Sequence, residues 1–163
     1  MRIGIDAMGG DFAPREVVRG ALEALPNLNG HEIVMLGDQA AVEAEISRWD
    51  KPISGRYSIV HTTEVIGMCD VPVEAVRTKK DSSIVRMASM ASNGELDAVI
   101  SAGNTGAFAA ASQFRMGLVP GVLRSGIAVV LPSFNGPIVM CDVGANLTPK
   151  PQHLLQYGIM ASV

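Results

Sequence analysis

The chain has 163 residues, of which 48% are hydrophobic and 18% charged, and its formal net charge is −3. This acidic balance provides no general positive field for nucleic acid or anionic lipid, so partners of those classes would require a local basic cluster. Cys69 and Cys141 lack metal or redox spacing, and no apolar run approaches the roughly 18 residues of a membrane-spanning helix. We expect one folded domain over residues 1–163, either soluble or peripheral to a membrane.

Short β-rich runs alternate with amphipathic segments along the first hundred residues. Strands are predicted at residues 2–7, 32–36, 57–61 and 98–101. Helices are predicted at residues 14–25, 39–48, 71–80 and 83–92. The third helix is expected to begin with Asp70 as its N-cap, and the fourth with Ser82 or Ser83. The alternation predicts an α/β fold with a mostly parallel sheet covered by helices on both faces.

The pattern changes after residue 106. Two β-rich runs flank a Pro132–Gly136 turn signature and predict an antiparallel hairpin near residues 126–141. A helical stripe of Leu154, Leu155 and Ile159 then follows Pro151. The stripe reaches Val163 without a closing signal, so we expect a chain that is cut within a helix.

Three polar turns rich in small residues follow predicted strands, at residues 6–11, 101–106 and 142–146. Their candidate binding residues are Asp6, Gly9, Gly10, Asp11, Ser101, Gly103, Gly106, Asp142, Gly144 and Asn146. Because the carboxyl ends of parallel strands line the ligand crevice of an open α/β sheet, we expect these turns to converge. One such turn alone is more often a tight connection, whereas three together favour a site.

The second turn leads directly from a strand into a helix. Unpaired backbone N–H groups and the helix dipole favour an anion there, and the Asn104 amide and the Thr105 hydroxyl add donors. The chain contains neither a Walker motif nor a dinucleotide fingerprint. The aspartates of the first and third turns are better suited to holding loop amides, or a cation, than to contacting an anion. The sequence therefore predicts an anion site of unassigned ligand.

The only dense basic stretch contains Arg77, Lys79, Lys80 and Arg86. Lys79 is interpreted as part of a solvated helix face. Arg77 and Lys80 lie three residues apart, so they share a face and could contact an anion or an acidic protein. No spacing of histidines, serines or cysteines indicates a metal centre or a covalent nucleophile, and we expect no metal, no cofactor and no nucleic acid partner.

The three turns, together with residues 72–77 and 80–83, resemble the bacterial phosphate acyltransferases of phospholipid synthesis along the whole chain. The resemblance implies transfer of a fatty acyl group from acyl-acyl carrier protein to inorganic phosphate, giving acyl phosphate and free carrier protein. It also implies a fold similar to the isocitrate and isopropylmalate dehydrogenases and the phosphotransacetylases. Members of the family are dimers that work at the cytoplasmic membrane surface, and they are about twice as long. We therefore expect this chain to be the first half of such an enzyme and to be inactive, or nearly so, by itself.

Phosphate is already an oxygen nucleophile at neutral pH and a thioester is an activated acyl donor, so this reaction needs no strong general base. The enzyme must hold phosphate against the thioester carbon and stabilise the developing oxyanion. Asn104, Thr105 and the neighbouring amides are the candidates for these roles, while Arg77 and Lys80 would contact phosphate or the acidic carrier protein. Two alternatives stay open: acyl transfer between coenzyme A and phosphate, as in phosphotransacetylases, and a non-catalytic anion-binding domain.

Overall fold

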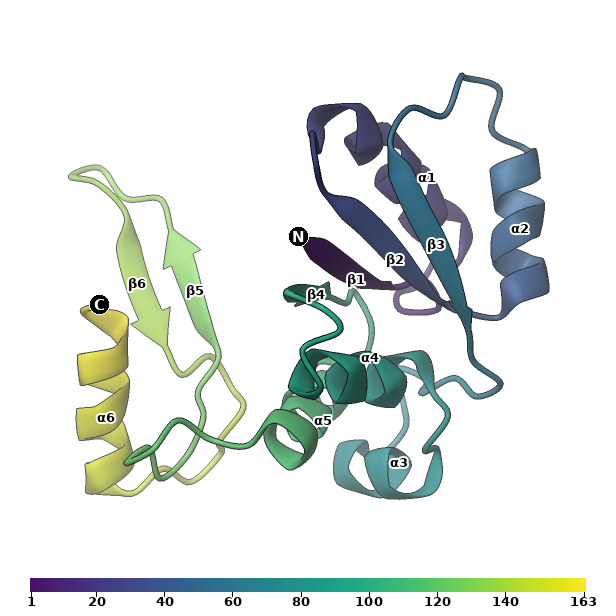
Figure 1. The fold of residues 1–163 in the computed structure, drawn as a ribbon. Helices are drawn as coiled ribbons and strands as arrows, with labels where there is room; N and C mark the ends of the chain where they lie inside the picture. Colours follow the sequence, from purple (N-terminus) through teal and green to yellow (C-terminus); the bar gives the residue numbers. More distant parts are fainter. The chain divides into compact units, whose positions relative to one another are not determined.

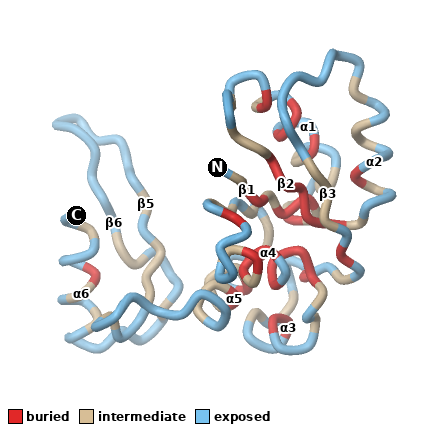
Figure 2. Tube along the Cα trace, in the orientation of Figure 1, coloured by how far each residue is buried: buried red, intermediate tan, exposed pale blue.

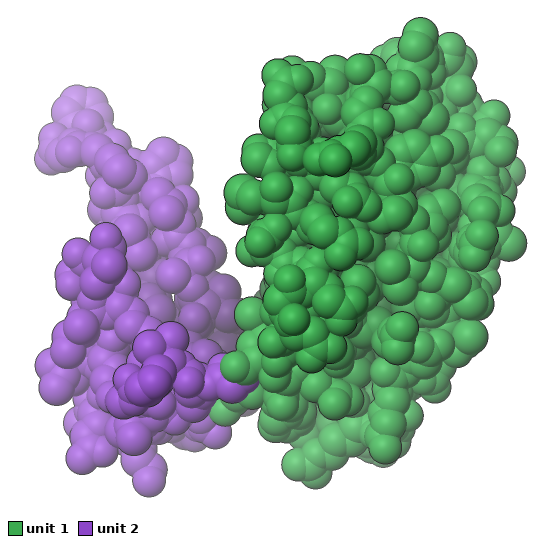
Figure 3. Space-filling view, in the orientation of Figure 1, with its two compact units in different colours: residues 1–116 green, residues 117–163 purple.

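The computed structural model describes residues 1–163, which form two compact units, Met1–Met116 and Gly117–Val163 (Figure 3). The predicted α/β class is confirmed, because the first unit holds a parallel sheet with helices and the second a separate antiparallel pair. No helix in either unit has both the length and the apolar character required to cross a membrane. That residues 1–163 form a single domain stays a prediction.

The first unit is built on a sheet of four parallel strands (Figure 1). They are β1 (Arg2–Asp6), β2 (Glu32–Gly37), β3 (Arg56–His61) and β4 (Ala98–Ile100). The spatial order is β3-β2-β1-β4, so the chain first moves outward from β1 and later returns to its other side. In the register of the sheet, Ile5 pairs with Met35 on one side and with Ile100 on the other. This reversal makes the carboxyl ends of β1 and β4 the topological switch point, where open α/β sheets form their ligand crevice.

The helices of the first unit lie close to the predicted ranges. They are α1 (Arg15–Ala24), α2 (Gln39–Ser47), α3 (Pro72–Thr78), α4 (Ser83–Ser92) and α5 (Thr105–Met116), with a short 3₁₀ helix, η1 (Leu25–Asn27), after α1. Helix α1 ends where Pro26 interrupts the pattern, and Asn93 and Gly94 close α4. Pro26 and the Asn93–Gly94 pair therefore set the ends of α1 and α4.

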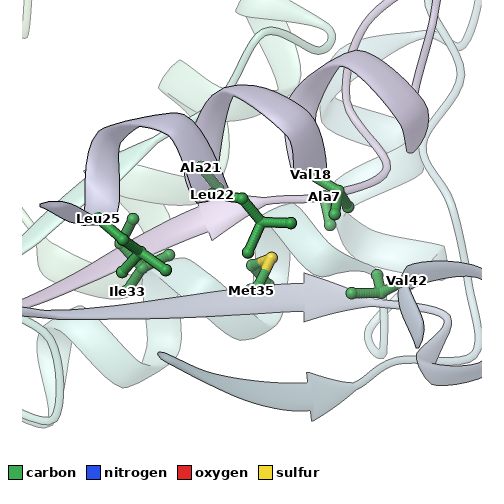
Figure 4. Packing of buried hydrophobic residues seen from close by; sticks show 8 residues of the cluster. All are labelled: Ala7, Val18, Ala21, Leu22, Leu25, Ile33, Met35 and Val42. Atoms are coloured by element: carbon green, nitrogen blue, oxygen red, sulfur yellow. The ribbon is translucent and has the colours of Figure 1, made fainter. Parts of the chain in front are cut away.

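Strand β2 is buried on both faces, and its alternating side chains divide the core into two layers. Ile33 and Met35 point toward α1 and α2, where they pack with Val18, Leu22 and Val42 (Figure 4). The intervening Val34 and Leu36 belong to a second cluster on the α4 side. Figure 2 shows the resulting buried band along β1, β2 and α4. The sheet is thereby held between two helical layers.

Small residues bring α3, α4 and α5 together beside the sheet. Ala107 and Ala111 of α5 are fully buried against Ile84 and Ala88 of α4 and Val76 of α3. Alanine side chains let helix backbones approach closely, so the beginning of α5 is fixed by packing as well as by the preceding strand. This packing positions the second small-residue turn.

The prediction that Asp70 caps α3 is wrong. The N-cap is Val71, which supplies no side-chain hydrogen bond, and Asp70 lies one residue too early. Its carboxylate instead accepts hydrogen bonds from Lys79 Nζ, at 2.5 Å, and from Gly67 N–H, at 2.9 Å. These two contacts hold the pKa of Asp70 below its ordinary value. Lys79 also donates to the Val65 carbonyl, so it ties the end of α3 to the preceding loop rather than lying on a solvated face.

The second unit contains the predicted hairpin, formed by β5 (Ala128–Leu131) and β6 (Ile138–Cys141), and a helix, α6 (Pro151–Ala161). Tyr157 is the buried side chain of α6, and a Cβ added at Gly126 would lie 3.1 Å from its ring. The stripe expected on α6 is not buried in this unit, because Leu154, Leu155 and Ile159 are each more than half exposed. The apolar face of α6 therefore remains open within the described residues.

Candidate functional site

The first two small-residue turns meet at the carboxyl ends of β1 and β4. Ser101 Oγ donates a 2.7 Å hydrogen bond to Asp6 Oδ2, and the Gly103 N–H donates to Ser101 Oγ at 3.1 Å. The other carboxylate oxygen, Asp6 Oδ1, accepts from the Met8 N–H. Asp6 is buried, so its carboxylate joins the bases of both turns away from water. It holds loop groups, the role expected for a carboxylate beside an anion site.

Glycine is required where the two turns touch. A Cβ added at Gly9 would lie 2.3 Å from Asp6 Oδ2 and 2.8 Å from the Gly103 nitrogen. Gly10 has a φ of +109°, in the region that L side chains rarely adopt, and it faces Ala102. The two backbones therefore approach each other directly. Asp11 follows these glycines and is exposed.

Asn104 fixes the beginning of α5, and its side chain is fully engaged in doing so. Its Oδ1 accepts the Ala107 N–H at 3.0 Å, which is the geometry of an N-cap. Its Nδ2 donates to the carbonyls of Gly67, Met68 and Asp70, at 3.1, 3.3 and 3.1 Å. The side-chain amide is thus committed to the loop that precedes α3. A direct contact of this amide with a ligand stays a prediction, and the geometry assigns Asn104 a positioning role.

The unused hydrogen-bond donors of the second turn belong to the backbone. Within the first unit, the N–H groups of Asn104, Thr105 and Gly106 donate to no acceptor, and the Thr105 hydroxyl also has no partner. Thr105 and Gly106 are exposed. A Cβ at Gly106 would lie 2.7 Å from Pro72 Cγ, so this end of α5 lies directly against the start of α3. Free amides at the positive end of a twelve-residue helix can bind an anion.

The third turn belongs to the second unit, where Asp142 organises it. The Asp142 carboxylate accepts hydrogen bonds from the backbone N–H groups of Ile127, Ala145 and Asn146 and from Asn146 Nδ2. Burial raises the pKa of Asp142, but these hydrogen bonds outweigh burial and lower the pKa below its ordinary value. Gly144 has a φ of +104°, which permits the tight turn. That this turn joins the first two stays a prediction.

Arg77, on α3, and Lys80, just after α3, lie beside the end of α5 and not beside its free backbone amides. The Arg77 guanidinium stacks over the Phe114 ring at 5.7 Å, and both basic residues line a hollow of about 350 Å³ with Phe114 and Arg115. Phe114 lies nine residues beyond Thr105, which corresponds to about 14 Å along the helix. The structure therefore brings Asp6 and the glycines together with the start of α5, and it places the basic residues near its end.

Two features of this region were not anticipated from the sequence. The loop of residues 67–70 holds Asn104, and Phe114 and Arg115 complete the basic hollow. Both depend on helices and loops that are distant in sequence, and no local pattern indicates such contacts. Only the positive charge of Arg115 in the last turn of α5 could have drawn attention to it.

Comparison with known proteins finds close relatives along the whole chain. A family model described as "Fatty acid synthesis protein" matches residues 1–163. A phosphate acyltransferase of Pelotomaculum thermopropionicum is 48% identical over 160 residues, which cover 98% of this chain and 46% of the relative. Those of Geobacillus thermodenitrificans and Oceanobacillus iheyensis are each 46% identical over 164 residues, covering 100% of this chain and 48% of each relative. The chain spans about half the length of these curated relatives.

Proposed function

Because the chain belongs to the fatty acid synthesis protein family, as the resemblance of its turns indicates, we propose that it forms the amino-terminal half of a phosphate acyltransferase. The acyl donor is an acyl-acyl carrier protein, the acceptor is inorganic phosphate and the products are acyl phosphate and free carrier protein. The relatives named phosphate acyltransferase support acyl transfer to phosphate. The acidic carrier protein as donor belongs to the proposal.

The observation that carries the proposal is the set of free N–H groups at the start of α5, located at the switch point of the sheet. In the reaction, a phosphate oxygen attacks the thioester carbon, so that a C–O bond forms and the carbonyl oxygen becomes negative. The intermediate then collapses, the C–S bond breaks and the carrier leaves as a thiolate that takes up a proton. The backbone N–H groups of Asn104, Thr105 and Gly106 can stabilise either the phosphate or this oxyanion without rearrangement.

The remaining residues of the two turns hold these donors in place. Asp6 and Ser101 join the turns, while Gly9, Gly10 and Gly103 allow the backbones to approach. Asn104 fixes the first turn of α5, and Thr105 provides an additional free hydroxyl. Asp11, and Asp142, Gly144 and Asn146 of the third turn, stay predicted binding residues.

The setting of the enzyme is also part of the proposal. We expect a homodimer that works in the cytoplasm at the membrane surface, with membrane attachment through parts outside residues 1–163. We expect residues 1–163 alone to be inactive, because a crevice for two substrates needs walls from the rest of the protein. No metal or cofactor is needed for the proposed chemistry.

The assay that tests this function uses the full-length protein that carries these residues, with long-chain acyl-acyl carrier protein and inorganic phosphate. Acyl phosphate and free carrier thiol are expected to appear in equal amounts, and only when phosphate is present. A turnover of acyl-coenzyme A at a similar rate, with coenzyme A competing against the carrier protein, would instead show a phosphotransacetylase-like enzyme. If no thioester is consumed, the domain is a non-catalytic anion-binding domain.

A further inference from the structure

We propose that Arg77, Lys80, Phe114 and Arg115 form a docking surface for an acidic protein, separate from the anion site at the start of α5. This surface, named here the basic surface, is built by α3, α5 and the residues that follow α3. The partner is the acidic acyl carrier of the proposed function, and its identity rests on that function. The basic surface itself rests on charge, shape and position.

The three cations of the basic surface have no carboxylate partner. None of the seven ion pairs in the structure contains Arg77, Lys80 or Arg115. Arg77 instead stacks on Phe114, whose side chain is half exposed. Three unpaired cations at one place on a chain of net charge −3 form a local positive region that can attract an acidic surface.

A second basic hollow, around Trp49, provides a contrast. It is lined by cations from α1 and from residues 48–51, but these have carboxylate partners. Arg15 pairs with Glu16, Arg48 with Glu45, and both Arg19 and Lys51 with Glu23. Asp50 also lines this hollow, so four carboxylates balance its four cations and it has little attraction for an acidic partner. Charge complementarity therefore distinguishes the basic surface from this hollow.

The shape of the basic surface favours a protein over a lipid bilayer. Lys80 and Arg115 lie between two hollows, one of about 350 Å³ beside Phe114 and one of about 430 Å³ beside Arg86 and Met90. Glu95 is the one carboxylate lining the second hollow, and it accepts a hydrogen bond from Asn93. A concave surface that exposes an aromatic ring and arginines can accept protruding side chains of a partner protein. Aromatic residues and arginine are typical anchors of protein interfaces. A flat lipid headgroup surface would leave both hollows unfilled.

The distance from the free amides explains why two substrates could bind together. Phe114 lies about 14 Å along α5 from Thr105, so a phosphate at the free amides and the acidic groups at the basic surface would use different contacts. Phosphate could then occupy the amides while the carrier protein is bound. This separation assigns Arg77 and Lys80 to the acidic partner rather than to phosphate.

The test is a double charge reversal, Arg77→Glu with Arg115→Glu, in the full-length protein. The matched control is Arg19→Glu with Lys51→Glu, which changes the net charge equally at the paired hollow. The variant is expected to raise the KM for acyl-acyl carrier protein about tenfold or more and to leave the KM for phosphate within about twofold. Its KM for the carrier should also lose most of its dependence on salt, while the control behaves like the unmodified protein.

Several outcomes would overturn the docking surface. One is an equal rise in the KM for the carrier in the control variant. Another is a raised KM for phosphate in the Arg77→Glu, Arg115→Glu variant. A third is that this variant loses binding to anionic vesicles while its KM for the carrier stays unchanged. Binding of the acidic carrier protein is also measured directly, by fluorescence titration, because this readout does not require turnover. If the unmodified protein binds the carrier but converts no thioester, the proposed function fails. The docking surface is then still tested by titration, because the double variant should bind the carrier more weakly than the unmodified protein. If it binds no carrier, the surface is wrong.

Discussion

Replacing Gly9 by alanine is expected to reduce acyl phosphate formation by about 100-fold in the full-length protein, because the two turns can no longer meet. The new Cβ would lie 2.3 Å from Asp6 Oδ2 and 2.8 Å from the Gly103 nitrogen. Backbone and a buried carboxylate must then shift, which moves the start of α5 relative to β1. Overpacking of this kind also costs about 1 to 3 kcal/mol of stability, measurable by urea unfolding.

Gly20→Ala is the matched control for this substitution. Gly20 lies in the interior of α1, and a Cβ added there meets nothing within 4 Å. The control should keep full activity and gain roughly 0.5 to 1 kcal/mol of stability, because alanine favours the helix. Wild-type turnover by Gly9→Ala would show that the close approach of the two turns is not part of the site.

Replacing Asn104 by alanine is expected to lower the stability of the first unit by about 2 to 3 kcal/mol. The change removes the cap on Ala107 and leaves the carbonyls of Gly67, Met68 and Asp70 without their shared donor. Because the first turn of α5 would fray, the KM for phosphate should also rise about tenfold. Unfolding is measured on residues 1–163, and the KM in the full-length protein.

Two further variants separate the cap from the loop contacts. Asn104→Asp keeps an acceptor for the Ala107 N–H but turns a carboxylate toward three carbonyl oxygens, so it should be at least as unstable as the alanine variant. Asn93→Ala removes an exposed asparagine at the end of α4 and should change stability by less than about 0.5 kcal/mol. A KM for phosphate that stays normal in Asn104→Ala would remove Asn104 from the positioning of the anion site.

Local patterns in the sequence are sufficient to predict most elements of the first unit. Strand β2 is an apolar run bounded by polar loops, and its burial on both faces follows from the parallel sheet that the strand and helix alternation implies. The hairpin of β5 and β6 follows in the same way from two β-rich runs around a turn of Pro, Asn and Gly. The meeting of the first two turns also follows, because parallel strands place their carboxyl ends at one edge.

The contacts that refine the site depend on residues that are distant in sequence. Asn104 looks like a free donor in the sequence, yet three carbonyls more than thirty residues away occupy its amide. Arg77 looks equally suited to phosphate or protein until its stacking on Phe114 places it near the far end of α5. Lys79 and Asp70 form an ion pair, so Lys79 does not lie on a solvated face and the Asp70 carboxylate does not cap α3. Propensity and spacing carry no information about such tertiary partners.

The most direct test of the central claim removes one backbone donor from the start of α5. Proline is tolerated at the first position of a helix, so Thr105→Pro deletes the Thr105 N–H while α5 persists. Thr105→Ala is the control, since it removes only the hydroxyl and keeps the N–H. The measurement is kcat/KM for phosphate in the full-length protein. If backbone amides bind phosphate or the oxyanion, Thr105→Pro should lose about 10- to 100-fold and Thr105→Ala less than about fivefold. Equal, small losses in both variants would contradict the anion site.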